Sequence, residues 1–342
     1  MTKSDTAATR FERKPWVAWL MLCALFAGFV ELTLRLVNPD ILRFAYEFRQ
    51  VYRYHDRWYT DFEPSSSSVV RLSGDDGYVV NFLLTVNAQG FRFYDQPAGR
   101  QRRLLEAQRY VHLTGDSFAM GWGVNYESSL PAQLEGLLAT DTAVLNLGLN
   151  GFGAIAATEK SAAVAQRFPP AHVIYLATQN DYADDEQAHR YAQLPAITHS
   201  AMVGVNWLRQ HTYVASAPFA MRWWLYYRKA FDRDAIRPIE TNARPKLLPI
   251  AGEANSSLGI HSKRAIRQFA DRLSDDGVPF TVVAHGINAV SEDIVRFCRQ
   301  ENIATLLIDV PEELKLVGDG HFNAAGNKAL ARLLLEQLQL SE

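Results

Sequence analysis

A serine in a Gly-Asp-Ser turn is the first residue of this chain that could do covalent chemistry. Ser117 follows the apolar run 110–114 and precedes a stretch with helical pattern. A strand-to-helix turn exposes a hydroxyl at the edge of an α/β sheet and points free backbone N–H groups at the same spot. Ser117 is therefore a candidate nucleophile, provided that the rest of the chain supplies a base and an oxyanion site.

A candidate base stands near the C-terminal end, in the sequence Gly-Asp-Gly-His-Phe-Asn of residues 318–323. His321 precedes an amphipathic run, with Asn323 as a plausible N-cap. An imidazole takes a proton from a serine effectively when a carboxylate fixes its tautomer and stabilises the imidazolium. Asp319 is the nearest carboxylate in the sequence. The alternative is a surface histidine in a Gly/Asp turn.

Two further segments contain groups that could stabilise an oxyanion. Residues 142–153 have the pattern of a strand, a glycine-rich loop containing Gly151 and the start of a helix. Residues 173–181 have the pattern of a buried parallel strand that ends at Asn180. Backbone N–H groups of a glycine turn and an asparagine amide are donors of the right type. Taken alone, segments of these two kinds more often serve only as a structural loop or a helix cap.

Together, the four blocks resemble the SGNH (GDSL-type) hydrolase superfamily. They occur in order as Gly-Asp-Ser, Asn-x-Gly-x-x-Gly, Asn-Asp and Asp-x-His. The resemblance implies that Ser117 is the nucleophile, His321 the base and Asp319 the residue that orients it. It also implies an oxyanion hole made by the Ser117 N–H, the Gly151 N–H and the Asn180 amide.

The resemblance covers roughly residues 80–340, with two departures from the common pattern. Residues Asn87–Arg92 look like the Asn-x-x-Gly-Phe-Arg turn that precedes the first block in membrane-anchored bacterial members. Thr178 stands where the third block commonly has glycine. The acid and base are two residues apart, whereas the common spacing is three and would fall on Gly318.

Composition excludes some classes of function. The 342 residues are 48% hydrophobic and carry a net charge of −2. The chain therefore lacks the excess of positive charge that is typical of nucleic-acid-binding proteins. Cys23 and Cys298 lie far apart and form neither a disulfide framework nor a metal-binding spacing. We read Asp184–Glu186 as a solvated turn, with a divalent metal there as the minor alternative. No cofactor and no metal are expected.

The N-terminal segment is apolar enough to anchor the chain in a membrane. Residues 16–30 carry no charge, and the roughly 20 residues that a bilayer requires are reached by including Glu31 and Arg35. These two lie four apart on one helix face and can pair at the interface. Four basic residues precede the segment, Lys3, Arg10, Arg13 and Lys14. We therefore predict a cytoplasmic tail over 1–15 and an uncleaved anchor over 16–37, with a cleaved signal peptide or a buried helix as the alternatives.

The remaining pattern predicts an α/β fold. Apolar strands alternate with helix-length segments, which indicates a doubly wound, flavodoxin-like parallel sheet of about five strands with helices on both faces. Strands are expected near 109–114, 142–147, 171–177, 279–285 and 303–308, and helices near 127–139, 153–167, 261–276, 290–300 and 323–339. Ligands of such sheets bind at the carboxyl ends of the strands, where the predicted site residues fall.

Three regions complete the predicted organisation. Residues 38–100 are expected to form a juxtamembrane connector and a small β-rich segment, and 101–342 the hydrolase domain. A helical, aromatic-rich insertion spans 182–260 and includes Trp207. Its aromatic residues are either core, or a lid over the site, or a shelf that touches lipid.

The predicted function is a serine esterase or deacylase that acts through an acyl-enzyme. Its catalytic domain would lie on the periplasmic side of the cytoplasmic membrane, with an acyl ester of an envelope glycan or lipid as substrate. One alternative is an O-acyltransferase that modifies an envelope polysaccharide, because the acyl-enzyme is common to both reactions. A second alternative is a non-catalytic component of envelope assembly.

Overall fold

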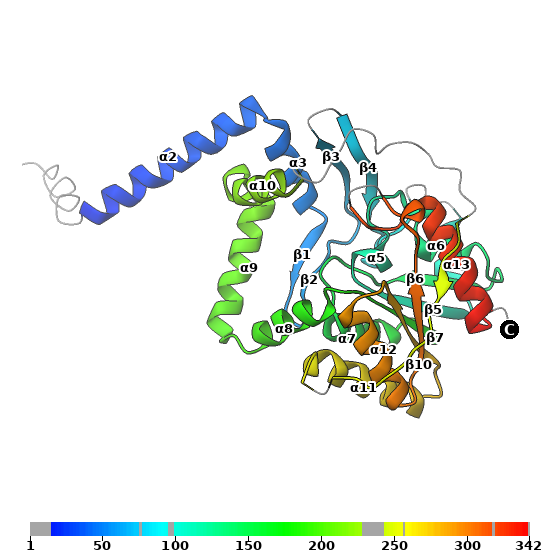
Figure 1. Ribbon diagram of the computed structural model, residues 1–342. Coiled ribbons are helices and arrows are strands. Elements are labelled where there is room, and N and C mark those ends of the chain that lie inside the picture. The colour runs from blue at the N-terminus through cyan, green and yellow to red at the C-terminus, as the bar shows by residue number, and fades with distance from the viewer. Residues whose placement is uncertain are drawn as a thin grey trace, which may run out of the picture.

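The computed structural model describes residues 15–74, 77–94, 99–227, 243–255, 257–316 and 319–340, and Figure 1 shows its course. Its first helix, α2 (Pro15–Val37), projects away from the body of the molecule and buries none of its residues. The helix is long and apolar enough to cross a membrane, and a signal sequence near an N-terminus has the same character. Helix α2 matches the predicted bounds of the anchor within one residue.

A six-stranded sheet forms the centre of the body, in the order β6-β5-β7-β9-β10-β8. Its strands are β5 (Arg109–Gly115), β6 (Thr142–Asn146), β7 (Pro170–Ala177), β8 (Lys246–Leu247), β9 (Phe280–His285) and β10 (Ala304–Asp309). The five longer strands pair in parallel and confirm the predicted fold. The short edge strand β8 pairs antiparallel with β10. The sequence did not reveal it, because two residues show no periodicity.

Helices cover both faces of this sheet (Figure 1). One layer contains α6 (Leu130–Glu135) and α13 (Ala324–Leu338), and the other contains α7 (Ala154–Ala165), α11 (Ile260–Asp275) and α12 (Ala289–Gln300). Each layer packs on its own apolar cluster. Helix α6 is shorter than the predicted 127–139, because Pro131 fits only the first turn of a helix and residues 126–128 form a separate 3-10 turn.

The strand order places a switch point at β5. The chain leaves β5 toward β6 on one side and then crosses back over β5 to reach β7 on the other. At such a point neighbouring loops diverge and leave a crevice outside the carboxyl ends of the strands. The Gly-Asp-Ser turn follows β5 and therefore lies at this crevice.

The segment before the sheet is a helix followed by two hairpins. These elements are α3 (Asp40–Arg49), β1 (Tyr52–His55), β2 (Tyr59–Phe62), β3 (Ser67–Gly74) and β4 (Gly77–Thr85), and α4 (Arg100–Glu106) leads into the sheet. Both hairpins lie within residues 38–100, the range expected to hold a connector and a small β-rich segment. Phe48, Phe62 and Phe82 share one apolar cluster with Met120 and Trp122, which follow the serine turn. The segment therefore packs directly against the elements that hold the candidate nucleophile.

The insertion begins with three helices, α8 (Asp181–Ala192), α9 (Ala196–His211) and α10 (Tyr213–Tyr227). The side chains at 223–227 and Phe231 lie outside the described part of the chain. Our reading of Asp184–Glu186 as a solvated turn was wrong. These residues lie in α8, and the buried Asp185 carboxylate accepts hydrogen bonds from the backbone N–H groups of Ala154 (2.9 Å) and Ile155 (2.8 Å) at the start of α7. The carboxylate thus caps α7.

Candidate active site

The turn that carries the candidate nucleophile is built at the end of β5. Gly115 has φ +143°, and a Cβ atom there would lie 2.5 Å from a carbonyl oxygen of β7, so the tight exit requires glycine. Asp116 then accepts a hydrogen bond from the Phe118 N–H (2.9 Å) and caps the short helix α5 (Ser117–Met120). The serine hydroxyl is consequently presented on the first residue of a helix.

Three of the predicted residues meet at this turn. Ser117 Oγ lies 2.7 Å from His321 Nε2, although 204 positions separate them in the chain. His321 Nδ1 lies 2.7 Å from Asp319 Oδ1. The Phe118 ring stacks on the imidazole at 4.3 Å and restrains it from one face. A serine, an imidazole and a carboxylate in this order form the arrangement needed to activate a hydroxyl as a nucleophile.

Trp122 is a fourth member of this group that the sequence did not identify. Its indole Nε1–H donates to Asp319 Oδ2 over 3.0 Å. The indole ring is buried and makes edge contacts with Phe48 (6.0 Å) and Phe82 (5.3 Å). Asp319 is thereby held from two sides, by Trp122 and by His321. The only sequence signal was the position of a tryptophan five residues after the serine.

Thr178, the departure from the common third block, connects several polar groups beneath the turn. Its hydroxyl lies 2.8 Å from Asp116 Oδ2, 2.6 Å from Asn180 Oδ1 and 3.1 Å from Asp181 Oδ1. Burial raises the pKa of Asp116 and raises that of Asp181 well above its usual range, which favours a protonated carboxyl in this network.

The predicted oxyanion donors lie at the ends of their strands. The Asn180 amide oxygen faces the Thr178 hydroxyl, and its Nδ2 donates to Asp184 Oδ2 over 2.5 Å, which fixes the orientation of the amide. Gly151 lies in an exposed turn with φ +75°, and no atom occupies the space where a Cβ would be. The convergence of these donors with the Ser117 N–H stays a prediction.

The loop after α5 is held by contacts that the sequence analysis did not identify. Arg92, from the predicted Asn-x-x-Gly-Phe-Arg turn, is fully buried and donates to the carbonyl oxygens of Met120 (2.9 Å), Gly121 and Val124. A Cβ at Gly148 would lie 2.4 Å from the Met120 nitrogen. The turn and the second block therefore support the serine helix from two sides, which gives a physical reason for both patterns.

A second histidine, also unforeseen, lies at the end of β9 beside the site. The His285 ring contacts the rings of Phe118 (5.2 Å) and Phe322 (4.7 Å). Burial, together with the nearby positive charges of Lys315 and His321, lowers the pKa of His285 to about 3. His285 is therefore neutral at physiological pH and forms part of the wall of the site.

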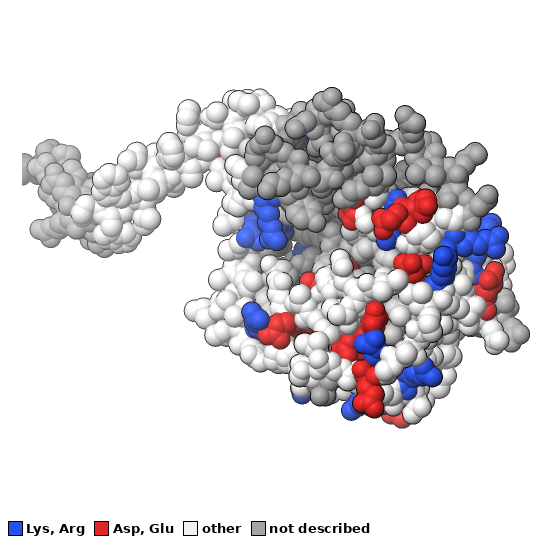
Figure 2. Space-filling model, in the orientation of Figure 1, with Lys and Arg blue, Asp and Glu red and all other residues white. Residues whose placement is uncertain are grey.

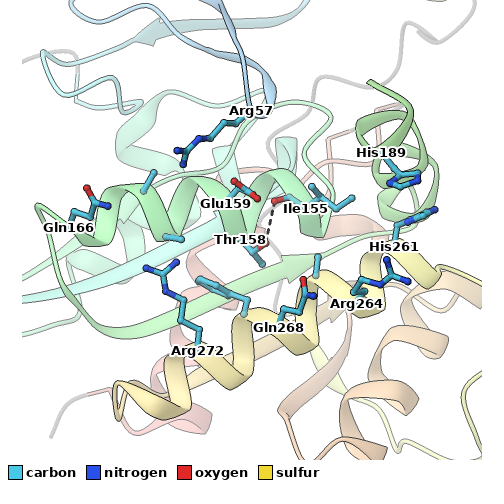
Figure 3. Close-up of a pocket in the computed structure, with 14 residues that line it drawn as sticks. Arg57, Ile155, Thr158, Glu159, Gln166, His189, His261, Arg264, Gln268 and Arg272 are labelled. Atoms are coloured by element: carbon cyan, nitrogen blue, oxygen red, sulfur yellow. Dashed lines mark hydrogen bonds between the residues drawn. The ribbon is translucent and has the colours of Figure 1, made fainter. Parts of the chain in front are cut away.

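A separate cavity of about 450 Å³ lies between α7, α8 and α11. Figure 3 shows Arg57 and Arg272 directed toward the end of the cavity where Gln166 lies. His189 and His261 stack at 3.7 Å at the other end. The triad residues do not line this cavity. Among the described residues no group of three His, Cys, Asp or Glu could hold a metal ion.

Comparisons with known proteins find similarity to solved structures only. No protein-family model matches the chain, and no curated protein matches its sequence. The chain is similar to a member of the G-D-S-L lipolytic family from Veillonella parvula, with 12% identity over 68% of this chain and 98% of that chain and a TM-score of 0.38. It is also similar to a carbohydrate acetylesterase from Sinorhizobium meliloti (11% identity, 68% and 99% coverage, TM-score 0.36). A GDSL-like lipase from Bacteroides thetaiotaomicron gives 10% identity, 71% and 95% coverage and a TM-score of 0.35.

Proposed function

We propose that this chain is an SGNH-type serine hydrolase that cleaves acyl esters. The observation that supports the proposal is the unbroken chain of contacts from Asp319 through His321 to Ser117, with 2.7 Å at each of its two links. The face of the molecule in Figure 2 carries acidic and basic side chains side by side. The charge distribution on this face does not favour a polyanionic partner.

The mechanism has two half-reactions. His321 Nε2 accepts the Ser117 proton while Ser117 Oγ bonds to the acyl carbon, and the carbonyl electron pair moves to its oxygen. Asp319 stabilises the imidazolium that forms. The tetrahedral intermediate collapses, and the leaving alcohol takes the proton from His321. Water then attacks the acyl-enzyme by the same path and releases the acid and free Ser117.

The developing oxyanion is assigned to the Ser117 N–H, the Gly151 N–H and the Asn180 amide. All three follow the carboxyl ends of neighbouring strands, β5, β6 and β7. Preorganised donors of this kind are worth most in the transition state, when the charge appears on oxygen. The fixed amide of Asn180 favours this role, because its Nδ2 carries a second hydrogen besides the one directed at Asp184.

The site of action is assigned to the outer surface of a cytoplasmic membrane. Helix α2 would span the membrane as an uncleaved anchor, and the four basic residues before it would remain in the cytoplasm. The catalytic domain would then lie in the periplasm or its equivalent. Its substrate would be an acyl ester of an envelope glycan or lipid.

The experiment that tests the function is labelling of the purified full chain with a serine-directed fluorophosphonate, followed by turnover of an ester panel. Ser117→Ala should abolish both, whereas Ser128→Ala, a partly buried serine of the following loop, should retain both. Panel reactions with and without a polysaccharide acceptor separate hydrolysis from acyl transfer, because only the transferase forms the acylated glycan. Absence of both labelling and turnover in the folded wild type would favour a non-catalytic role.

A further inference from the structure

Helix α9 turns its apolar side chains outward and its polar side chains toward the protein, which is the reverse of a helix on a water-exposed surface. Ten of its positions are exposed: Ala196, Ile197, Ser200, Ala201, Val203, Gly204, Val205, Trp207, Leu208 and His211. None of them is Asp, Glu, Lys or Arg. Ile197 is 79% exposed and Trp207 is 56% exposed. A surface helix in water normally turns such side chains inward and its polar side chains outward.

The polar side of α9 faces the protein and is bonded there. His199 Nδ1 lies 2.8 Å from the Tyr54 hydroxyl. Gln210 donates to the Tyr52 carbonyl oxygen, and Gln50 donates to the Gln210 carbonyl oxygen. These contacts tie α9 to β1 and α3. Turning the apolar face inward would break these hydrogen bonds, so they fix the outward orientation of that face.

The charged pair near the end of α2 holds the corner between α9 and α10. Glu31 accepts hydrogen bonds from the backbone N–H groups of Tyr213 (2.9 Å) and Val214 (3.0 Å). Arg35 donates to the His211 carbonyl oxygen (2.7 Å) and to Glu31 (2.8 Å). The carboxylate thus caps the start of α10, and the guanidinium caps the end of α9. The two charges predicted to pair at the membrane interface do pair, and they also fix α9 to the end of α2.

We propose that the outward face of α9 lies in the interfacial layer of the bilayer that α2 crosses. The inference rests on the membrane anchoring proposed above. Figure 2 shows the arm formed by α2 almost without charged side chains. A helix with an apolar face and a tryptophan lies stably at the boundary between headgroups and acyl chains.

The bilayer is favoured over a second copy of the chain as the occupant of this face. The clamp from Glu31 and Arg35 places the end of α9 where the chain leaves the membrane, so the face continues the lipid-exposed surface of α2. Helix α9 also contacts β1 and α3, which pack against the cluster around Trp122. Contact with lipid would therefore hold the catalytic domain close to the membrane and favour acyl esters held at its surface.

The inference is tested with the full chain in proteoliposomes, by measuring how nitroxide-labelled lipids quench fluorophores placed at different positions of the protein. In a Cys23→Ser background, in which Cys298 stays buried, single cysteines at three exposed leucines are labelled with an environment-sensitive fluorophore. Leu208→Cys reports on α9, Leu25→Cys on α2, and Leu137→Cys, 40% exposed beyond α6, is the matched control. Phosphatidylcholine with a nitroxide near the headgroup should reduce the Leu208→Cys signal by about half or more and leave the Leu137→Cys signal unchanged.

Each outcome decides between the proposals. Suppose that a mid-chain nitroxide quenches the fluorescence of the Leu25→Cys label while the Leu208→Cys label is not quenched by any lipid. This result would overturn the α9 inference and still support α2 as a membrane anchor. A bright Leu25→Cys label would show that α2 does not cross the bilayer, and the inference would fall with the anchor. Disulfide-linked dimers through Leu208→Cys without lipid quenching would assign the face to a second copy of the chain.

Discussion

Trp122 donates its indole N–H to the Asp319 carboxylate oxygen that His321 does not contact. The bond is 3.0 Å long, and the other oxygen lies 2.7 Å from the imidazole. The same indole packs against Phe48 of α3, the helix that follows α2. The position of the predicted acid is therefore fixed by a side chain that is buried against the helix following α2.

Trp122→Phe should lower kcat by about 10-fold with little change in KM, because a hydrogen bond to a charged group is worth roughly 1.5–3 kcal/mol and the ring remains to fill the cluster. Steady-state kinetics on an ester substrate measure the effect. Trp58→Phe is the control, since the buried Trp58 Nε1–H has no hydrogen-bond partner among the described residues. Equal losses in both variants would mean that the effect comes from packing alone.

Thr178→Val should also lower kcat by about 10-fold, because the isosteric valine removes the hydroxyl that faces Asp116 and Asn180. Thr178→Ser keeps the hydroxyl and should retain most of the activity. The comparison uses kcat, KM and the rate of fluorophosphonate labelling in all three proteins. If serine fails to rescue the rate, the methyl group of Thr178 matters and the hydroxyl network does not.

Asn180→Ala should reduce kcat by about 10²-fold or more and leave KM almost unchanged, because an oxyanion donor strengthens its bond only in the transition state. Gln179→Ala, an exposed neighbour in the same loop, should keep a normal kcat. Initial rates over a range of substrate concentrations separate the two constants. A loss confined to KM would make Asn180 a substrate-binding residue.

The sequence predicted the sheet because strand patterns are local. Apolar runs gave the five parallel strands, and a strand that ends in Gly-Asp-Ser has few geometric solutions. Ser117, Asp319 and His321 were implied together by the resemblance; the structure brings their side chains into contact, and their catalytic roles stay a prediction. The sequence could not reveal Trp122 or Arg92 as supports of the site, because their partners lie 197 and about 30 positions away and depend on packing. Asp185 was misread for the same reason, since only the tertiary fold brings its carboxylate to the start of α7.

His112 should make the protein less stable at acid pH. The ring is fully buried, with Nδ1 2.9 Å from Ser161 Oγ and Nε2 2.8 Å from the Phe168 carbonyl oxygen. Burial lowers the pKa of His112 to about 4, from an ordinary value of 6.5. Between these values the unfolded chain binds the proton and the folded chain does not, so the free energy of unfolding falls as the pH is lowered from 6.5 to 4.

The expected contribution of this histidine is on the order of 3 kcal/mol across that range. Urea unfolding of the full chain in detergent at several pH values measures it, as the difference between wild type and His112→Gln. The stability advantage of the wild type should shrink toward pH 4 and stay constant above pH 7. A constant difference at all pH values would mean that His112 does not titrate in this way.

The topology proposed for α2 predicts where a C-terminal reporter will be found. Alkaline phosphatase fused after Glu342 should be active in a bacterial host, because it folds only outside the cytoplasm and the basic residues before α2 would hold the N-terminus inside. A fusion to residues 1–14 alone, which carries no apolar helix, should be inactive and serves as the control. A silent full-length fusion that is stably expressed would contradict the topology.

An N-terminal sequence of the mature protein that begins after Gly28 would instead show that the helix is cleaved as a signal peptide. The lipid contact inferred for α9 would then lose its anchor.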